Sequence, residues 1–411
     1  MGASRIFFFN RFFWPDQSAT AQILTDLCRE LETKGYRIAV VTSRLDYANK
    51  QIQYPGREKM GNVEVIRLWS TRFGRGSIAG RLLDYLTIYL SFFFFILRRL
   101  EPEDIAVLKT DPPLLSILGA VAKSLRQVRI VSWCQDVFPE VAMAEIGPAA
   151  GMGWILGLLR WLRDWSLQAS DRVVVLGRDM RDYLAARPVD SGRLAVIPNW
   201  SIQEDRGARD ETQLRREWNI PGHCLVVGYS GNLGRAHDWQ TLLGAAELLG
   251  DQPDLLFLCC GGGHGYQQLE KAVEERGLSG RFRFLPYQPR ELLSASLRVP
   301  DLHWLTLKKR LTQFIFPSKF YGILQAGRPL LFVGDSRSEL ADIIDGARIG
   351  GSVSEGDSEG MAALIRQFAA DRRELQAAGE RARATWERGF QKATEVAKWD
   401  RMLQKLQTVT L

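Results

Sequence analysis

Short apolar runs alternate with longer amphipathic stretches along most of this chain. Apolar runs of about four to eight residues predict buried strands, and the stretches between them have the spacing of helices that cover a sheet. This alternation is typical of βαβ units and a parallel sheet. In the first half the expected strands are Arg5–Asn10, Arg37–Thr42, Val63–Leu68, Ile105–Lys109, Arg129–Trp133, Arg172–Leu176 and Leu194–Ile197. The expected helices are Ala19–Lys34, Ile78–Arg99, Leu115–Leu125, Gly153–Ala169 and Arg178–Ala186.

The alternation stops between Ser201 and Pro221, in a polar segment with no long apolar run. We interpret it as an interdomain linker with a short helix over Glu211–Trp218. Beyond it the expected strands are Leu225–Tyr229, Leu255–Cys260, Phe282–Pro286, Leu302–Leu307 and Pro329–Val333. The expected helices are Gln240–Leu249, Tyr266–Arg276, Pro317–Gln325 and Ser338–Asp345, and the chain is expected to be helical from Gly360 to its end.

Length and composition fit two globular domains. The chain has 411 residues, and a single core seldom grows beyond about 250–300 residues. Hydrophobic residues make up 46% and charged residues 25%, which excludes a disordered chain. We expect an α/β fold with two doubly wound, Rossmann-like domains at 1–200 and 222–385, a linker at 201–221 and a closing helix at 386–411. Ligands of such folds bind at the carboxyl ends of the strands, which predicts a site in a cleft between the domains.

The net charge of +7 is concentrated in the first half of the chain. Residues 1–200 carry 26 basic and 20 acidic side chains, whereas residues 201–411 carry 28 and 27. A basic excess favours an anionic partner, such as a nucleic acid, an anionic lipid or a phosphate-bearing substrate. The five cysteines lack zinc-site spacing, which favours buried free thiols in a reducing cytosol.

No targeting or spanning segment is expected. The apolar start Arg5–Phe13 runs into Trp14-Pro15-Asp16 without a cleavage site for a secretory signal. The longest apolar run, Tyr85–Leu97, is shorter than the roughly 18–20 residues that a membrane span needs.

Two glycine-rich segments follow expected strands of the second half. Gly231-Asn232-Leu233-Gly234-Arg235 precedes a helix, so that backbone amides and Arg235 would meet a phosphate; a plain strand-to-helix turn is the alternative. The run Gly261–Gly263 with Gly265 has more glycine than a turn needs. Close approach of a nucleotide and a flexible loop explain this run about equally well. No acidic residue follows at the distance that the dinucleotide fingerprint requires.

Pro317-Ser318-Lys319 is a third candidate for binding phosphate. A proline in the first helical turn followed by Ser318 and Lys319 places a hydroxyl, amides and an ammonium at one helix start. The alternative is a lysine on a solvated helix face.

Asp136 is the carboxylate of the first half that is best placed to meet a substrate. It follows the expected strand Arg129–Trp133, where it would act as a base or orient an acceptor hydroxyl. The alternative is an Asx-type cap of the next turn. The loop Trp14–Thr20 precedes the first helix, and capping by Ser18 is its simpler interpretation.

Two stretches suggest a surface that meets a membrane. The apolar stretch Ile78–Arg99 has arginines in or near it, at positions 72, 75, 81, 98 and 99. The stretch Gly153–Ala169 holds Trp154, Trp161, Trp165, Arg160 and Arg163. Arginine and tryptophan on an amphipathic helix suit a membrane interface. The alternative is packing on the first sheet, which is favoured for Phe92–Phe95.

Five motifs in a fixed order resemble a known family. They are Pro-Asn-Trp at 198–200, Tyr-Ser-Gly-Asn-Leu-Gly at 229–234, Gly-Gly-Gly at 261–263, Pro-Ser-Lys at 317–319 and Ala-Gly-Arg-Pro at 326–329. Together they resemble the family 4 retaining glycosyltransferases, especially the branch that builds exopolysaccharide, colanic-acid and O-antigen units. The resemblance extends from about Arg5 to the terminal helices. It implies the GT-B fold, in which C-terminal helices cross back to the first domain.

The resemblance also implies how the domains divide the work. The second domain would bind a sugar nucleotide, with a UDP-sugar as the expected donor, and the first would take a polyprenyl-diphosphate-linked sugar, with Asp136 near the reacting sugar. The implied donor contacts are Gly231, Asn232 and Arg235 at the phosphates, Lys319 and Ser318 at the diphosphate, and Gly261, Gly262 and Tyr287 near the base. Transfer would retain the anomeric configuration and need no metal and no cofactor.

This chain departs from the family at three positions. Most members carry two glutamates eight positions apart, where this chain has Phe314 and Gly322. The glutamate that usually holds the ribose is therefore absent, as it often is in the Pro-Ser-Lys branch. The usual histidine beside Asp136 is replaced by Gln135.

The expected mechanism stabilises the leaving diphosphate without a metal. Lys319, Arg235 and helix-start amides would neutralise its growing charge, and Asp136 would orient the acceptor or the sugar. The enzyme is expected at the cytoplasmic face of the inner membrane, without a nucleic-acid partner. Two alternatives remain open: a sugar-nucleotide 2-epimerase of the same fold, although the chain has only four histidines, and a non-catalytic member that binds lipid or a protein.

Overall fold

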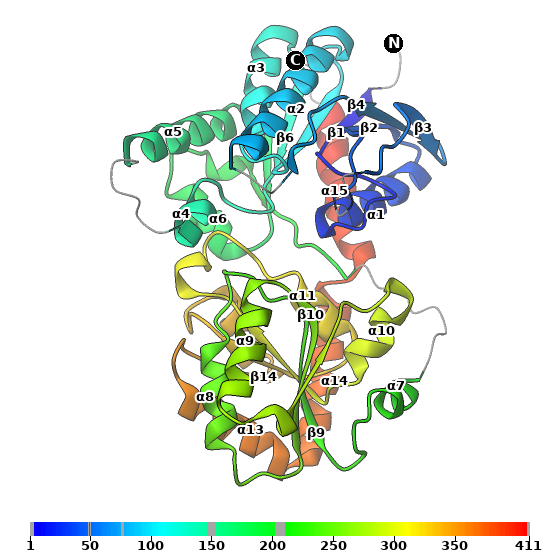
Figure 1. The fold of residues 1–411 in the computed structure, drawn as a ribbon. Helices are drawn as coiled ribbons and strands as arrows, with labels where there is room; N and C mark the ends of the chain where they lie inside the picture. The colour runs from blue at the N-terminus through cyan, green and yellow to red at the C-terminus, as the bar shows by residue number, and fades with distance from the viewer. Residues whose placement is uncertain are drawn as a thin grey trace. The chain divides into compact units, whose positions relative to one another are not determined.

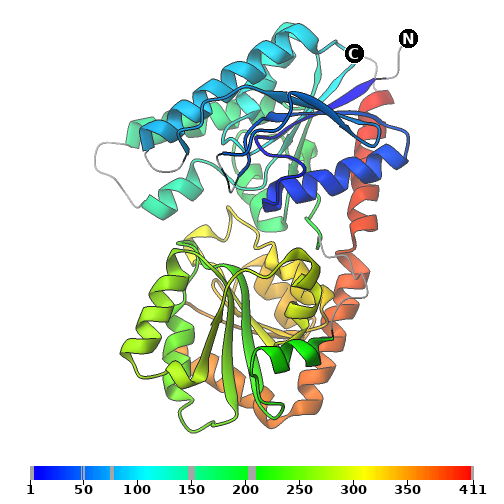
Figure 2. The same ribbon diagram turned by 45° about the vertical axis from the view of Figure 1, so that its right-hand side comes forward.

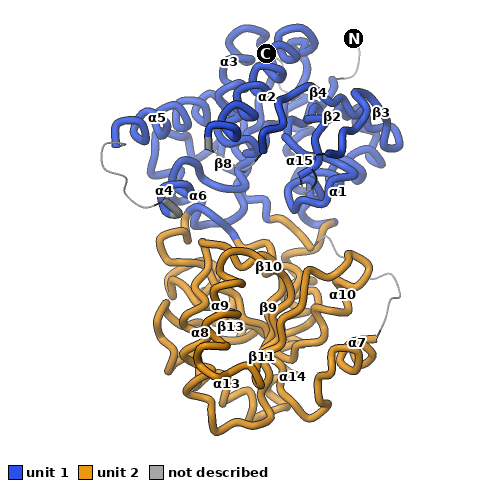
Figure 3. The backbone as a smooth tube through the Cα atoms, in the orientation of Figure 1, with its two compact units in different colours: residues 1–198, 314–316, 393–411 blue, residues 199–313, 317–392 orange. Residues whose placement is uncertain are grey.

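A computed structural model describes residues 4–47, 49, 51–74, 78–146, 153–201 and 210–408 of the chain. They form two compact units, each built on a largely parallel sheet with helices on both faces (Figure 1). Unit 1 comprises residues 1–198, 314–316 and 393–411, and unit 2 comprises residues 199–313 and 317–392 (Figure 3).

The sheet of unit 1 has eight strands in the order β3-β4-β2-β1-β5-β6-β7-β8. Their bounds are β1 Arg5–Phe9, β2 Arg37–Ser43, β3 Arg57–Met60, β4 Val63–Leu68, β5 Ile105–Lys109, β6 Arg129–Trp133, β7 Arg172–Val175 and β8 Leu194–Val196. All pairs are parallel except β3 with β4. The sequence pattern predicted every strand but β3, whose residues Arg-Glu-Lys-Met form no apolar run because the strand lies at the sheet edge.

Helices cover both faces of this sheet. Their bounds are α1 Ala19–Thr33, α2 Ile78–Arg99, α3 Ser116–Arg126, α4 Glu140–Ile146, α5 Gly153–Ala169, α6 Arg178–Ala185 and α15 Lys392–Thr408. The sequence pattern does not predict α4 as a separate helix. Helices α2, α3 and α5 lie side by side over one face, and α1 and α15 lie over the other (Figure 2). On the first face Phe92 of α2 packs edge-on against Phe9, with ring centroids 5.6 Å apart.

Helix α15 belongs to unit 1, although the chain reaches it from unit 2. Trp399 is fully buried, with its ring 4.7 Å from that of Trp133 on β6. The Tyr36 hydroxyl donates to Asp400 Oδ1 at 2.6 Å, and Lys34 Nζ lies 3.0 Å from Asp400 Oδ2. The closing helix begins at Lys392 rather than at the expected residue 386, because α14 continues to Gly389.

The sheet of unit 2 is fully parallel, with the order β11-β10-β9-β12-β13-β14. Its strands are β9 Leu225–Asn232, β10 Leu255–Gly262, β11 Phe282–Leu285, β12 Leu302–Thr306, β13 Leu330–Val333 and β14 Gly350–Val353. The sequence pattern did not predict β14, because Gly-Gly-Ser-Val is too short and too poor in apolar residues to stand out.

Eight helices of unit 2 are described. They are α7 Glu211–Glu217, α8 Gln240–Leu248, α9 His264–Glu275, α10 Arg290–Arg298, α11 Lys319–Gln325, α12 Glu339–Gly346, α13 Ser358–Ala370 and α14 Arg372–Gly389. The apolar faces of α8, α9 and α13 pack on one side of the sheet, and those of α7 and α10 pack on the other. Helix α10 was not expected. Residues 202–209 of the expected linker lie outside the described residues.

A three-residue segment, Phe314–Phe316, also belongs to unit 1. Val137 N donates to Phe314 O at 2.9 Å, and Ile315 forms an antiparallel bridge with Asp136. The Phe314 ring lies 4.9 Å from the Tyr183 ring, nearly perpendicular to it. The division of the chain therefore differs from the expected continuous domain at 222–385, because this pairing joins residues that are far apart in the sequence.

Candidate functional site

Two glycine segments meet at the carboxyl ends of β9 and β10. The strand register pairs Gly231 with Gly261 and Asn232 with Gly262. A Cβ atom on Gly261 would lie 2.1 Å from Gly231 O, and Gly261 has φ +148°. Only glycine fits this close approach with this backbone conformation. The result is a stretch of backbone without side chains at the edge where parallel sheets bind their ligands.

Lys319 reaches the same edge from the start of α11. Its Nζ donates to Asn232 O at 3.0 Å and lies 5.0 Å from the centroid of the Tyr229 ring. A Cβ atom on Gly231 would lie 2.7 Å from Lys319 Cε. Burial lowers the pKa of Lys319 to about 8, because loss of water disfavours the ammonium. The side chain is therefore mostly cationic at pH 7, beside the bare backbone of Gly231.

The remaining predicted donor contacts lie around this pair. The Tyr287 ring is 58% exposed, and its Cε2 would lie 3.0 Å from a Cβ on Gly262. Ser318 is the exposed N-cap residue of α11, and Arg235 is an exposed residue whose carbonyl accepts from Lys308 Nζ at 2.9 Å. The structure thus brings together Gly231, Asn232, Gly261, Gly262, Tyr287 and Lys319, with Ser318 adjacent in the chain and Arg235 three residues beyond Asn232. We call this group the glycine cradle.

His237 is a residue of this region that the sequence analysis did not single out. Its Nδ1 lies 2.6 Å from Thr306 O, and its ring centroid lies 6.2 Å from that of Tyr229. Burial and the positive charges of Lys319 and Lys308 lower its pKa to about 3. Its position in Gly-Arg-Ala-His, just after the glycine motif, is the signal that points to it.

Asp136 belongs to unit 1, apart from the other predicted residues. It is exposed and follows β6, where its backbone is held by the bridge to Ile315. Close behind it, a buried ion pair fixes the chain: Arg163 Nη1 lies 3.0 Å from Glu140 Oε2, and Arg163 Nη1 donates to Phe138 O at 3.2 Å. Burial alone would raise the pKa of Glu140, but the hydrogen bonds and charge of Arg163 lower it below its ordinary value.

Lys109 is a second residue that the sequence analysis missed. It ends β5 and is 2% exposed; its Nζ donates to Thr20 O at 2.7 Å and lies 4.2 Å from the Trp133 ring. Burial lowers its pKa to about 7, against the opposing effect of Asp111 and Asp136. The signal in the sequence is a lysine at the end of the otherwise apolar run Ile-Ala-Val-Leu.

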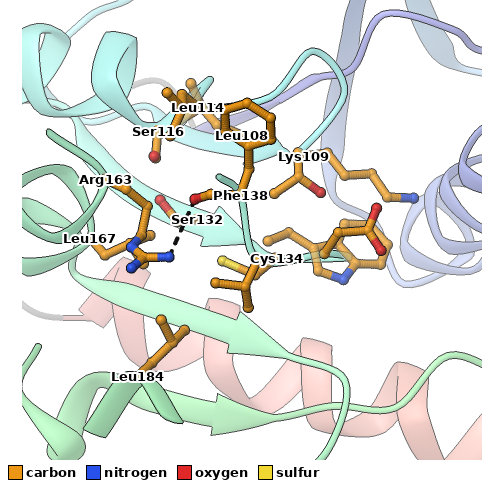
Figure 4. Close-up of a pocket in the computed structure, with 14 residues that line it drawn as sticks. Leu108, Lys109, Leu114, Ser116, Ser132, Cys134, Phe138, Arg163, Leu167 and Leu184 are labelled. Atoms are coloured by element: carbon orange, nitrogen blue, oxygen red, sulfur yellow. Dashed lines mark hydrogen bonds between the residues drawn. The ribbon is translucent and has the colours of Figure 1, made fainter. Parts of the chain in front are cut away.

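Asp136 is one of the residues that line a small cavity in unit 1 (Figure 4). Its wall is largely apolar, with Leu108, Leu114, Cys134, Leu167 and Leu184 around Arg163. Its volume is about 20 Å³, which is room for about one water molecule and far too little for a sugar. The cavity is therefore a packing feature next to Asp136 and no substrate pocket.

Metal-ligating side chains do not gather in the parts of the chain that the structure describes. In those parts, no group of three or more His, Cys, Asp or Glu side chains is arranged to hold a metal ion. All five cysteines are buried and free.

The outer faces of α2 and α5 expose large apolar side chains. On α2 they are Leu82, Leu83, Leu86, Leu90 and Phe94, and on α5 they are Trp154, Leu158, Trp161 and Trp165. The spacing of three and four residues places each set along one side of its helix. Arg81, Arg98 and Arg99 are exposed on α2, and Arg72 is exposed before it, whereas the expected Arg75 lies outside the described residues. We call these two rows the α2–α5 surface.

Helix α2 is also long and apolar enough to cross a membrane, by length and composition alone, over Ala79–Arg99. Its inner side is nonetheless part of the core, with Ile88, Phe92 and Ile96 buried. Asp84, 1% exposed on the same helix, accepts from Thr71 Oγ1 at 2.8 Å and Gly74 N at 2.7 Å. The buried apolar side chains pack the helix on the sheet of unit 1, and Asp84 joins it to the preceding segment Thr71–Gly74. The expected packing of the Phe92–Phe95 run is found for Phe92 and for Phe95, whose ring lies 6.0 Å from that of Phe7, while Phe94 is exposed.

Two families of known proteins match the two halves of the chain. The family described as Glycosyl transferase 4-like domain matches residues 18–200, and the family described as Glycosyl transferases group 1 matches residues 210–385. WcaI of Escherichia coli (strain K12), named as a colanic acid biosynthesis glycosyl transferase, is 26% identical over 347 residues, 80% of this chain and 83% of that protein. WbjE of Pseudomonas aeruginosa, named as a glycosyltransferase, is 26% identical over 285 residues, 68% of this chain and 70% of that protein.

Solved structures share the fold over nearly the whole chain. Sucrose-phosphate synthase from Thermosynechococcus elongatus has a TM-score of 0.78 at 15% identity, covering 98% of this chain and 99% of that one. HepE of Anabaena in complex with UDP-glucose has a TM-score of 0.71 at 15% identity, with coverage of 98% and 99%. The two family matches together span most of the chain, which therefore belongs to the glycosyltransferases, with a Glycosyl transferase 4-like domain followed by a Glycosyl transferases group 1 domain and with the GT-B fold.

Proposed function

We propose that this glycosyltransferase moves a sugar from a nucleotide sugar, a UDP-sugar, to a polyprenyl-diphosphate-linked sugar in the synthesis of a bacterial surface polysaccharide. The observation that carries the proposal is the glycine cradle, in which Gly231 and Gly261 present backbone without side chains at the strand ends and Lys319 supplies a cation. The names of WcaI and WbjE support the class of pathway.

The cradle has the chemistry of a diphosphate site. Bare backbone lets phosphate oxygens come close, and the ammonium of Lys319 lies within the same group of residues. Helix α9 begins at His264, directly after Gly261–Gly263, so its amide end adds partial positive charge. The HepE complexes with UDP and UDP-glucose support uracil as the base of the donor.

The reaction we propose retains the anomeric configuration and uses no metal. The bond between the anomeric carbon and the diphosphate oxygen breaks, and the acceptor hydroxyl forms its bond on the same face. The departing phosphate oxygen takes the proton of that hydroxyl. Lys319 and Arg235 stabilise the negative charge that grows on the diphosphate, and Asp136 orients the acceptor or the transferred sugar.

The acceptor side of the proposal rests on the α2–α5 surface. Leucine, phenylalanine and tryptophan side chains are exposed there beside arginines, which suits the headgroup region of an anionic bilayer. A lipid-linked sugar is held in such a bilayer. We therefore place the enzyme at the cytoplasmic face of the inner membrane, with unit 1 in contact with the lipid.

The first experiment is a thermal-shift panel of UDP, GDP and their sugars on the wild type and on Lys319→Ala. Binding stabilises a protein by an amount that grows with the logarithm of one plus ligand concentration over Kd, so millimolar ligand reveals weak sites. We expect UDP and UDP-sugars to raise Tm in the wild type and less in the variant. Lys271→Ala, which removes a solvent-exposed lysine of α9, is the matched control and should respond like the wild type.

The outcomes separate the alternatives. A Tm shift with GDP alone would indicate a GDP-sugar as the donor and leave the class of enzyme unchanged. The absence of any shift would favour the non-catalytic, lipid- or partner-binding alternative. An epimerised free sugar nucleotide, detected by NMR without an acceptor, would identify a 2-epimerase and contradict sugar transfer.

A further inference from the structure

The imidazole of His237 is held in one orientation and one tautomer. Its Nδ1 lies 2.6 Å from Thr306 O, and a carbonyl oxygen only accepts hydrogen bonds. Nδ1 therefore carries the proton and donates it. In the neutral ring Nε2 then keeps a free lone pair, on the side of the ring away from Thr306.

The surroundings of His237 keep this ring neutral. The ring is half-buried, which disfavours the charged form, and Lys319 and Lys308 add positive charge nearby. Together they lower its pKa to about 3, despite the opposing hydrogen bond to Thr306. At neutral pH the free side of the ring therefore offers a hydrogen-bond acceptor and no charge.

The ring stands beside the glycine cradle. Lys319 Nζ and the His237 ring both border Tyr229, at 5.0 and 6.2 Å from the centroid of its ring. The loop that carries His237 is fixed at both sides, since His237 N donates to Gly234 O at 3.2 Å and Lys308 N donates to Ala236 O at 2.9 Å. A ligand whose diphosphate lay at Lys319 would therefore bind in the neighbourhood of this fixed acceptor.

We propose that Nε2 of His237 accepts a hydrogen bond from a hydroxyl group of the sugar nucleotide bound at the glycine cradle. This inference rests on the proposed function and names a specificity-determining residue for it. A lone pair repels phosphate oxygens, so the partner must be a donor. The donors adjacent to the diphosphate are the hydroxyls of the ribose and of the transferred sugar.

The chain offers a reason for such a residue. The residues that form the glycine cradle include no carboxylate that could accept a hydrogen bond from a hydroxyl. A neutral acceptor also suits a site that already has a lysine, because it adds hydroxyl recognition without weakening the attraction for the diphosphate. An unmet hydroxyl in a closed site costs binding energy, so the acceptor favours ligands that carry the hydroxyl at this point.

The test compares His237→Ala and His237→Gln with the wild type by isothermal titration calorimetry, using UDP and UDP-glucose as probes and GDP and GDP-mannose as a second pair. We expect His237→Ala to bind the sugar nucleotide about 3- to 10-fold more weakly. Glutamine retains an acceptor oxygen and should recover part of the affinity. His223→Ala, which removes a solvent-exposed histidine of unit 2, should bind like the wild type.

The two nucleotide forms distinguish the two hydroxyl sources. Equal weakening of UDP and UDP-glucose assigns the bond to the ribose, whereas weakening of UDP-glucose alone assigns it to the transferred sugar. Unchanged Kd values for both ligands in His237→Ala overturn the inference while leaving the proposed function standing. An equal loss of affinity in His237→Ala and His237→Gln, accompanied by a lowered Tm, also overturns the inference, because a packing role of the ring explains it. A wild type that binds no nucleotide or sugar nucleotide overturns the proposed function and this inference together.

Discussion

Gly261 and Gly231 face each other across β9 and β10 with room for hydrogen atoms only. A Cβ on Gly261 would approach Gly231 O to 2.1 Å at φ +148°. We expect Gly261→Ala to lose at least about 2 kcal/mol of unfolding free energy, because a side chain at this φ strains the backbone and displaces Gly231. It should also abolish the Tm shift caused by UDP. The control is Gly280→Ala, where an added Cβ meets nothing within 4 Å. A normal Tm shift with UDP in Gly261→Ala would contradict the proposal that UDP binds at the glycine cradle.

Lys109 is a buried residue whose titration should make the unfolding free energy depend on pH. Its pKa falls from 10.5 to about 7 on folding, so the unfolded chain binds more protons between these values. The wild type therefore gains unfolding free energy as pH rises from 7 towards 10.5, by up to about 1.4 kcal/mol per pH unit from this group. We expect Lys109→Met to have a higher unfolding free energy than the wild type near pH 7, and this difference, measured by urea unfolding, should shrink as pH rises. A difference that stays constant with pH would mean that Lys109 titrates normally.

At the scale of elements, α2 and α5 each have one side buried in unit 1 and one side exposed to solvent. On α2 Ile88, Phe92 and Ile96 pack on the sheet, while Leu86 and Leu90 are about half exposed on the opposite side. We expect Leu86→Glu with Leu90→Glu to reduce binding to phosphatidylglycerol vesicles in a flotation assay by about tenfold or more, because two charges replace two apolar contacts. The fold should be retained, since both side chains lie outside the core.

Leu248→Glu is the matched control for the vesicle experiment. Leu248 is 45% exposed on α8 of unit 2 and is not part of the α2–α5 surface. Its variant should bind vesicles like the wild type. If the paired variant floats as the wild type does, the apolar row on α2 does not meet the membrane.

At the scale of the whole molecule, α15 completes unit 1 from the far end of the chain. Trp399 is fully buried against Trp133. We expect Trp399→Ala to cost about 3–5 kcal/mol, seen in calorimetry as a lower Tm for the transition of unit 1. UDP should still stabilise the transition of unit 2, because the glycine cradle lies entirely in that unit. Loss of the UDP response in this variant would place part of the site in unit 1.

Regular periodicity let the sequence predict most of the architecture. Buried parallel strands such as Ile105–Lys109 read as continuous apolar runs, because both faces of the sheet are covered. The elements that escaped prediction, β3, α4, α10 and β14, are short or lie at an edge, where burial imposes little pattern. The close pair of glycines in the second half was predictable for a similar reason. Glycine is required wherever backbones approach, so Gly231 and Gly261 stand out in the sequence itself.

Contacts between distant segments were decided only by the tertiary structure. The sequence by itself determined two α/β domains, their glycine motifs and a lysine after Pro-Ser, because local periodicity and backbone sterics leave a local record. It did not show that Phe314–Phe316 pairs beside Asp136, that α15 packs on Trp133, or that His237 and Lys319 border the same tyrosine. Nor did it reveal the depressed pKa values of Lys109 and His237, since burial and neighbouring charge arise only when separate segments pack together.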